Sequence, residues 1–159
     1  MGFLCLMSRI WLMELRRQAH SVYRCQYHLI WIPKFRYEVL VRGVADYLKI
    51  KLLEVRKYHP EIEYLETNIQ RDHLHLLVSF PPRYSISRVV QLIKQNTGRA
   101  LIQKFDFLKE RYPGLSTIWT RGYFASTVGL DERTIKAYIK YQQTEDTGQS
   151  QLKLRLSQT

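Results

Sequence analysis

The sequence has few cysteines, few acidic residues and no long apolar segment. Its two cysteines, Cys5 and Cys25, are too few for a disulfide framework or a four-thiolate zinc site, and they fit a reducing cytoplasm. No apolar run is long enough to cross a bilayer as a helix, so we expect no membrane span. The apolar stretch 1–13 also lacks a basic leading region and a small-residue cleavage site, unlike a typical signal peptide. These absences exclude a disulfide-stapled secreted domain and an integral membrane protein.

The shortage of acidic residues leaves a strongly basic chain. Lys and Arg number 25 against 14 Asp and Glu, a formal net charge of +11, which predicts an anionic partner, nucleic acid before membrane. A length of 159 residues with 45% hydrophobic content fits one domain with a real core. We expect that domain over residues 21–146, after an N-terminal extension of uncertain order (1–20) and before a polar tail (147–159). Met13 is an alternative start.

Apolar residues alternate along residues 71–80, which predicts a half-buried strand. The alternation directs Leu74 and Leu76 to one face and places His73 and His75 together on the other. Two imidazoles spaced i and i+2 on one face can reach one metal ion. Alone, such a pair is more often two ordinary surface histidines, so a third ligand and a nucleophile elsewhere in the chain must support the metal interpretation.

The remaining pattern predicts an α+β fold. The chain should run strand, helix, strand, strand, helix, strand, helix, which is the ferredoxin-like (RRM-like) split βαβ sandwich with a C-terminal helix. Its antiparallel sheet has helices on one face, and its first and third strands are neighbours, so His28 should lie near the histidine pair. Gly98 weakens the second helix, where a kink can form. The other expected strands are 21–32, 62–69 and 118–128, and the expected helices are 38–58, 86–109 and 132–145.

The last predicted helix carries Tyr138 and Gln142 at positions i and i+4, on one helical face. If that face meets the open side of the sheet, Gln142 adds an oxygen to the two imidazoles. Mixed nitrogen and oxygen ligation suits Mg²⁺ or Mn²⁺ bound with a nucleic-acid phosphate, and Zn²⁺ by the same ligand chemistry. Taken separately, a half-buried aromatic residue and a solvated amide are the simpler interpretations.

Together these residues resemble the single-tyrosine HUH transposases (IS200-like) of small bacterial and archaeal insertion sequences. His73-Leu74-His75 is similar to their histidine-hydrophobe-histidine motif, and Tyr138-x-x-x-Gln142 to their nucleophile and third metal ligand. The resemblance runs from about residue 21 to residue 143, and it includes the segments 27–36, 72–78 and 119–124.

The resemblance implies a metal-dependent transposase that acts on single-stranded DNA. Tyr138 would be the catalytic nucleophile, forming a 5′-phosphotyrosine intermediate, and His73, His75 and Gln142 would hold Mg²⁺, with Mn²⁺ as the alternative. The partners implied are single-stranded DNA with a subterminal hairpin and a second copy of the chain, in a cytoplasmic homodimer with shared active sites. The candidate DNA contacts, each equally consistent with a solvated charge, are Arg24, His28, Lys34, Arg36, Lys94, Arg99 and Arg121.

Three other functions fit the same residues. A domesticated relative would share Tyr138 and the histidines but process chromosomal repeat hairpins. A non-catalytic nucleic-acid-binding module of the same fold would bind DNA or RNA without a covalent adduct. A metal-dependent nuclease would use water in place of the tyrosine.

Overall fold

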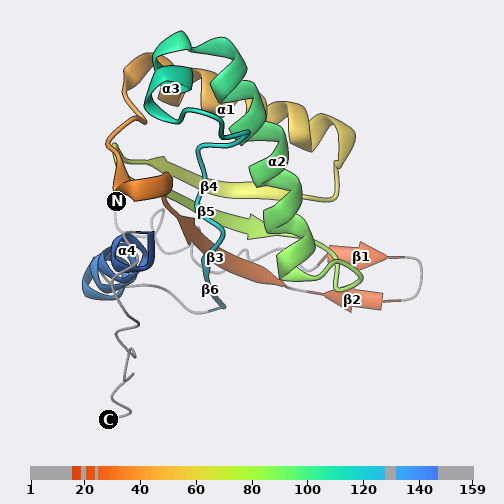
Figure 1. Ribbon diagram of the computed structural model, residues 1–159. Helices are drawn as coiled ribbons and strands as arrows, with labels where there is room; N and C mark the ends of the chain where they lie inside the picture. Colours follow the sequence, from red (N-terminus) through yellow and green to blue (C-terminus); the bar gives the residue numbers. More distant parts are fainter. Residues whose placement is uncertain (1–15, 19–20, 24, 128–131, 147–159) are drawn as a thin grey trace, which may run out of the picture.

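A four-stranded antiparallel sheet organises the chain (Figure 1). The computed structural model describes residues 16–18, 21–23, 25–127 and 132–146, with side chains over 25–127 and 133–142. The strand order is β4-β5-β3-β6, so the first and third strands of the split βαβ unit, β3 and β5, are neighbours, as predicted. The elements of this sheet and its helices are β3 (Gln26–Trp31), α1 (Arg42–Tyr58), β4 (Glu63–Ile69), β5 (Leu74–Ser79), α2 (Ile86–Lys104), α3 (Asp106–Arg111), β6 (Phe124–Ser126) and α4 (Glu132–Asp146).

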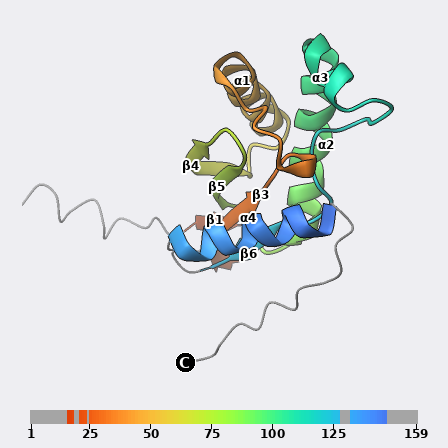
Figure 2. The same ribbon diagram turned by 60° about the vertical axis from the view of Figure 1, so that its left-hand side comes forward.

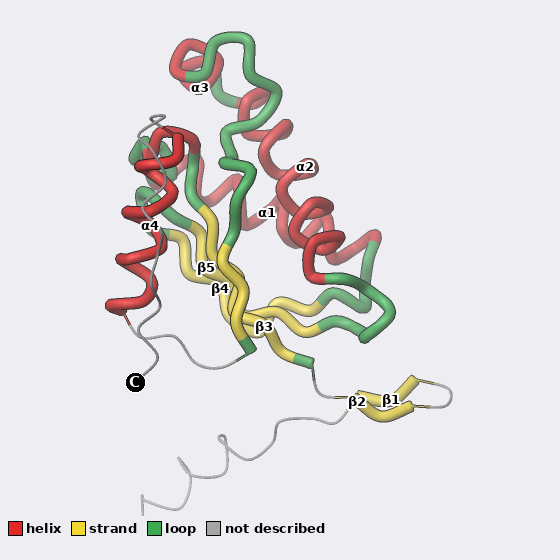
Figure 3. Tube along the Cα trace, turned by 60° about the horizontal axis from the view of Figure 1, so that its bottom comes forward, coloured by secondary structure: helices red, strands yellow, loops and turns green. Residues whose placement is uncertain are grey.

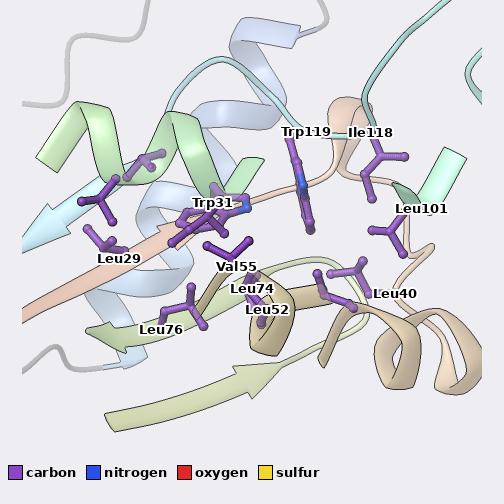
Figure 4. Close-up of a cluster of buried hydrophobic side chains, with 14 of the residues drawn as sticks. Leu29, Trp31, Leu40, Leu52, Val55, Leu74, Leu76, Leu101, Ile118 and Trp119 are labelled. Atoms are coloured by element: carbon purple, nitrogen blue, oxygen red, sulfur yellow. The ribbon is translucent and has the colours of Figure 1, made fainter. Parts of the chain in front are cut away.

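Helices cover both faces of the sheet. Helices α1 and α2 lie on one face and α4 lies across the other, as Figures 2 and 3 show. Between the sheet and α1 and α2 lies the main core, in which Leu74, Trp31 and Trp119 are almost completely buried (Figure 4). Burying each such side chain stabilises the fold by roughly 1.5–3 kcal/mol. Within the described ranges, no helix is both long and apolar enough to cross a membrane.

The predicted first strand, 21–32, is divided in the structure. Its first part is β2 (Ser21–Tyr23), which pairs with β1 (Arg16–Gln18) in a separate two-stranded sheet. Strand β1 therefore falls inside the segment expected to be an N-terminal extension. The second part, β3, pairs with β5 and β6. The alternation of apolar residues runs through both strands and does not mark the change of partner.

Helix α1 begins at Arg42, four residues later than expected. The backbone N–H of Leu40 donates to the carbonyl of Arg71 at 3.1 Å, so a tertiary hydrogen bond holds this segment in a non-helical path. Before it lies a short 3-10 turn, η1 (Lys34–Arg36), that the sequence pattern does not predict.

Helix α2 starts where expected and ends earlier. The Ser85 hydroxyl accepts from the backbone N–H of Arg88 at 3.2 Å, an N-cap interaction. The helix ends at Lys104, because Phe105 has an extended backbone, and α3 follows. At Gly98, where a kink was expected, α2 continues. A Cβ at Gly98 would lie 2.0 Å from the Thr117 side-chain oxygen, so this glycine permits close contact with a loop.

The predicted last strand, 118–128, shortens to the three residues of β6. Trp119 makes one isolated bridge to Pro33, and the chain then leaves the sheet before β6 begins at Phe124. In between, the carbonyls of residues 120–122 turn toward the Lys94 ammonium. A buried lysine thus interrupts the strand that the sequence pattern suggests.

Candidate functional site

His75 and His28 lie together on the sheet face opposite the main core. His75 is the register partner of Ile30 on β3 and of Asn68 on β4, which fixes the face. The His28 Nδ1 and His75 Nε2 atoms are 3.0 Å apart, which confirms that His28 lies near the histidine pair. Burial, and next repulsion from His28 and His73, lowers the pKa of His75. A lowered pKa favours the neutral imidazole, the form that binds metals.

His73 precedes β5 and is held by a carboxylate. Its Nδ1 is 2.8 Å from Asp72 Oδ1, while Asp72 Oδ2 accepts from Arg36 Nε at 3.1 Å. Burial would raise the pKa of the Asp72 carboxyl, but the hydrogen bonds from His73 and Arg36 outweigh it and lower that pKa. An ionised Asp72 accepts only, so it selects the His73 form with a proton on Nδ1 and leaves Nε2 as an electron-pair donor.

Helix α4 brings Tyr138 to the same face of the sheet. Tyr138 is 6% exposed, and it forms a small apolar cluster with Ile30, Ile32 and Ile139. Its ring centroid is 5.7 Å from that of Phe124 on β6. Ile30 on β3 is the register partner of His75 on β5. Tyr138, which packs on Ile30, therefore lies on the same face as His75 and one strand away from it. The condition set out from the sequence, that this helical face meets the sheet on the side opposite the main core, is therefore met.

Gln142 is seated against Gly122. It is 5% exposed, and a Cβ added to Gly122 would lie 2.6 Å from both Nε2 and Oε1 of Gln142. The missing side chain of Gly122 therefore makes the space that the amide occupies.

The Gly122 loop rests on Lys94. The Lys94 ammonium donates to the carbonyls of Thr120 at 2.9 Å, Arg121 at 3.3 Å and Gly122 at 2.6 Å. It also lies 5.5 Å from the centre of the Trp31 ring. Burial lowers the pKa of Lys94 to about 7. This side chain, expected as a DNA contact, is 9% exposed and engaged by the main chain, so the structure does not present it to a phosphate.

The donor set at this face fits a divalent metal. His73, with its Nδ1 on a carboxylate, has the arrangement typical of metal-binding histidines. His75 could add a second nitrogen and Gln142 an amide oxygen, and such a mixed set would suit Mg²⁺ or Mn²⁺. No cluster of three His, Cys, Asp or Glu side chains able to hold a metal occurs in the described part of the chain. A complete coordination sphere therefore needs the amide, water or a phosphate oxygen as well.

The other predicted DNA contacts differ in availability. Arg99 and Arg121 are exposed, Lys34 is half-buried, and Arg36 is paired with Asp72. Arg24 lies outside the described residues. The sequence interpretation missed two residues that shape the site, Asp72 and Gly122. The position of Asp72 directly before His73 was a usable signal, whereas the seat at Gly122 depends on tertiary packing alone.

The sequence is similar to known proteins over most of its length. Residues 21–142 match the family described as "Transposase IS200 like". The chain is 33% identical over 140 residues to the transposase for insertion sequence element IS200 of Salmonella typhimurium, covering 86% of this chain and 88% of that protein. It is 33% identical over 135 residues to the ISDra2 transposase TnpA of Deinococcus radiodurans, covering 84% and 95%.

A solved structure shows the same fold. The crystal structure of a putative transposase from Deinococcus radiodurans superposes with a TM-score of 0.72 at 32% sequence identity, covering 80% of this chain and 98% of that one. The family match spans most of the chain and includes both histidines, the tyrosine and the glutamine of the open face. The chain therefore belongs to the IS200-like transposase family.

Proposed function

We propose that this transposase cleaves and rejoins single-stranded DNA at the ends of an insertion sequence through a covalent bond to Tyr138. The observation that carries the proposal is the docking of α4, which packs Tyr138 against Ile30, the register partner of His75. The proposed nucleophile and the proposed metal ligand His75 thereby share one face of the sheet. A nucleic-acid-binding module needs no such arrangement.

In the proposed step, the Tyr138 phenol oxygen attacks the phosphorus of the scissile phosphodiester. A P–O bond to Tyr138 forms, the P–O3′ bond breaks, and the proton lost by the phenol is balanced by the proton gained at the 3′-oxygen. The products are a 3′-hydroxyl and a 5′-phosphotyrosine. Because the phosphodiester count is unchanged, rejoining to another 3′-hydroxyl needs no ATP, whereas attack by water would end in hydrolysis.

His73, His75 and Gln142 would hold the divalent ion, Mg²⁺ or Mn²⁺. Bound there, the ion supplies Lewis-acid polarisation of the scissile phosphate. The protein residues do the rest of the positioning: Asp72 orients His73, and Gly122 provides the seat for Gln142. Tyr138 is nearly covered in this arrangement, so its oxygen must become more exposed before a phosphate can reach it.

The net charge of +11 supports DNA as the partner, with a hairpin near the element end as the recognised feature. Arg99 and Arg121 remain the exposed candidates for phosphate contact. Such contacts release counterions, so affinity should fall steeply as salt rises. Hairpin or single-stranded DNA should bind more tightly than plain duplex.

We also propose a homodimer in which each active site combines the histidines of one subunit with the tyrosine of the other. In the single chain, α4 rests on its own sheet. Strand β6, next to α4 in sequence, is a three-residue strand at the sheet edge, where a second copy can pair. A shared site would keep a lone subunit from cutting until both DNA ends are held.

The test is incubation of the protein with labelled single-stranded element ends and Mg²⁺, followed by a denaturing gel. A covalent protein–DNA adduct that disappears with chelator and with Tyr138→Phe supports the proposal. Binding without any adduct would identify a non-catalytic module, and cleavage without an adduct a water-using nuclease. An adduct formed only with chromosomal repeat hairpins would identify a domesticated relative.

A further inference from the structure

The side chains of Arg36, Asp72 and His73 form a continuous chain of hydrogen bonds. Arg36 Nε donates to Asp72 Oδ2 at 3.1 Å, and Asp72 Oδ1 lies 2.8 Å from His73 Nδ1. Each carboxylate oxygen thus has its own partner. The Asp72 side chain is 21% exposed and that of His73 15%, so solvent reaches these groups only in part. In such surroundings a charge-assisted hydrogen bond is stronger than in open water.

The backbone that presents Arg36 is unusual. Phe35 and Arg36 have φ values of 59° and 52°, in the left-handed region that non-glycine residues seldom adopt. Such backbone is strained, so surrounding contacts must hold it. Those contacts include the Lys34 backbone N–H, which donates to the Ile118 carbonyl at 2.7 Å, and the Tyr112 hydroxyl, which donates to the Lys34 carbonyl at 3.3 Å.

The turn η1 also touches α4. One short segment therefore contacts the helix that carries Tyr138 and, through Arg36 and Asp72, the imidazole of His73. The strained turn is held in place by its surroundings and lies next to a candidate metal ligand. These features are those expected of a segment that positions a functional side chain. In this arrangement Arg36 serves Asp72 and is not directed at a phosphate.

We propose that Arg36 and Asp72 are positioning residues that fix the His73 ring, with its proton on Nδ1, so that Nε2 is ready for the divalent ion. This rests on the proposed function in one respect, the identity of His73 as a metal ligand. Asp72 sets the proton position and the ring angle. Arg36 prevents the carboxylate from turning away.

The first test reads the proton position without any metal. Long-range ¹H–¹⁵N spectra of the metal-free full chain at pH 8 show which ring nitrogen of each histidine carries the proton, and the His73 signals are those lost in His73→Ala. We expect the proton on Nδ1 in the wild type and a shift toward Nε2 in Asp72→Ala. Asp72→Asn, which keeps an oxygen acceptor, should fall between them. An Nδ1 proton that is unchanged in Asp72→Ala overturns the proposal.

The second test is Mn²⁺ affinity by titration calorimetry. Loss of an orienting partner typically weakens metal binding 10–100-fold, and we expect about that for Asp72→Ala and a smaller loss for Arg36→Met. The matched control is Arg71→Ala, because Arg71 is a neighbouring arginine whose ion pair, with Glu38 at 3.2 Å, is exposed on both sides. Affinity within twofold of the wild type in Asp72→Ala overturns the proposal. If the wild type itself binds no Mn²⁺, the proposed metal fails, and the proton position still decides the role of Asp72.

A third measurement separates positioning from DNA contact at Arg36. The slope of log affinity for hairpin DNA against log salt counts the phosphates that are neutralised. Arg36→Met should leave this slope unchanged while it weakens Mn²⁺ binding. A slope reduced by about one, with metal affinity retained, would make Arg36 a phosphate contact and overturn its part in the proposal.

Discussion

The two faces of the central sheet are built from the same strands and have opposite characters. On β5, Leu74 and Leu76 are completely buried against α1 and α2, whereas His75 between them is half-exposed on the other face. On β3, Leu29 joins the main core, whereas His28 meets His75. One face provides most of the folding free energy, and the other can hold polar groups that contribute little to it. Changes to the histidines on this second face should therefore alter chemistry and leave the fold intact.

The largest expected effect on activity comes from removing the hydroxyl oxygen of Tyr138. Tyr138→Phe keeps the ring that packs on Phe124, so thermal stability should change by less than about 1 kcal/mol. Adduct formation should fall by more than about 10³-fold, because phenylalanine lacks the phenol oxygen that the proposed step requires. Quantitative denaturing gels measure the adduct, and Tyr141→Phe, three residues further along α4, is the matched control. An adduct mapped to Tyr141 by mass spectrometry would contradict the assignment.

Mixing inactive variants sharpens the question of which chain supplies each half of the site. His75→Ala lacks a proposed metal ligand and Tyr138→Phe lacks the proposed nucleophile, so each alone should be inactive. If sites are shared, random exchange makes about half of the dimers mixed, each with one complete site, and about a quarter of wild-type activity returns. Activity that stays at background after verified subunit exchange would mean that α4 works on its own sheet, where it lies in the single chain.

Adjacent leucines on β5 compare the two faces directly. Leu76 is fully buried in the main core, and Leu76→Ala should lower the free energy of unfolding by about 2–5 kcal/mol. Leu77 is half-buried on the open face, so Leu77→Ala should cost less than about 1.5 kcal/mol. Urea denaturation at fixed pH measures both. Equal losses would show that the open face is as important to stability as the core.

Alanine substitutions at Gly98 and Gly122 compare the two faces with the smallest change of structure, one added methyl group. An alanine Cβ at Gly98 would lie 2.0 Å from Thr117 Oγ1 and 2.8 Å from Trp119 Cδ1, so Gly98→Ala should destabilise the fold by about 1–3 kcal/mol. At Gly122 the same atom meets the end of the flexible Gln142 side chain, which can move aside. Gly122→Ala should therefore change stability by less than about 1 kcal/mol.

The readout for Gly122→Ala is metal binding. The displaced Gln142 amide should weaken Mn²⁺ affinity in calorimetry, whereas Gly98→Ala, still folded at low temperature, should retain it. Unchanged Mn²⁺ affinity in Gly122→Ala would remove Gln142 from the ligand set.

Patterns within one element predicted the fold well. The alternation along 71–80 assigned each side of β5 correctly, and Ser85 marked the start of α2. The errors arose where tertiary contacts override local pattern. Helix α2 was expected to run to residue 109 but ends at Lys104, where Phe105 has an extended backbone, and at Gly98 the helix continues because the glycine allows close contact with the Thr117 side chain.

The candidate site was predictable as a set of residues and not as a geometry. The spacing of His73 and His75, and of Tyr138 and Gln142, placed each pair on one face. The left-handed turn at Phe35 and Arg36 has no local signal, because neither residue is a glycine. The burial of Lys94 could not be inferred either, since a lysine on a helix is usually exposed.

The way Lys94 is buried bears on how this family can diverge. Its ammonium donates hydrogen bonds to the main-chain carbonyl oxygens of residues 120–122. Every amino acid has such an oxygen, so these bonds do not depend on the side chains of the loop. The path of the loop is thus largely independent of the side chain at an exposed position such as 121. Substitutions there should leave the position of Gln142 against Gly122 unchanged. The surface at position 121 can therefore vary in evolution while the lysine and Gly122 maintain the shape of the loop beneath it.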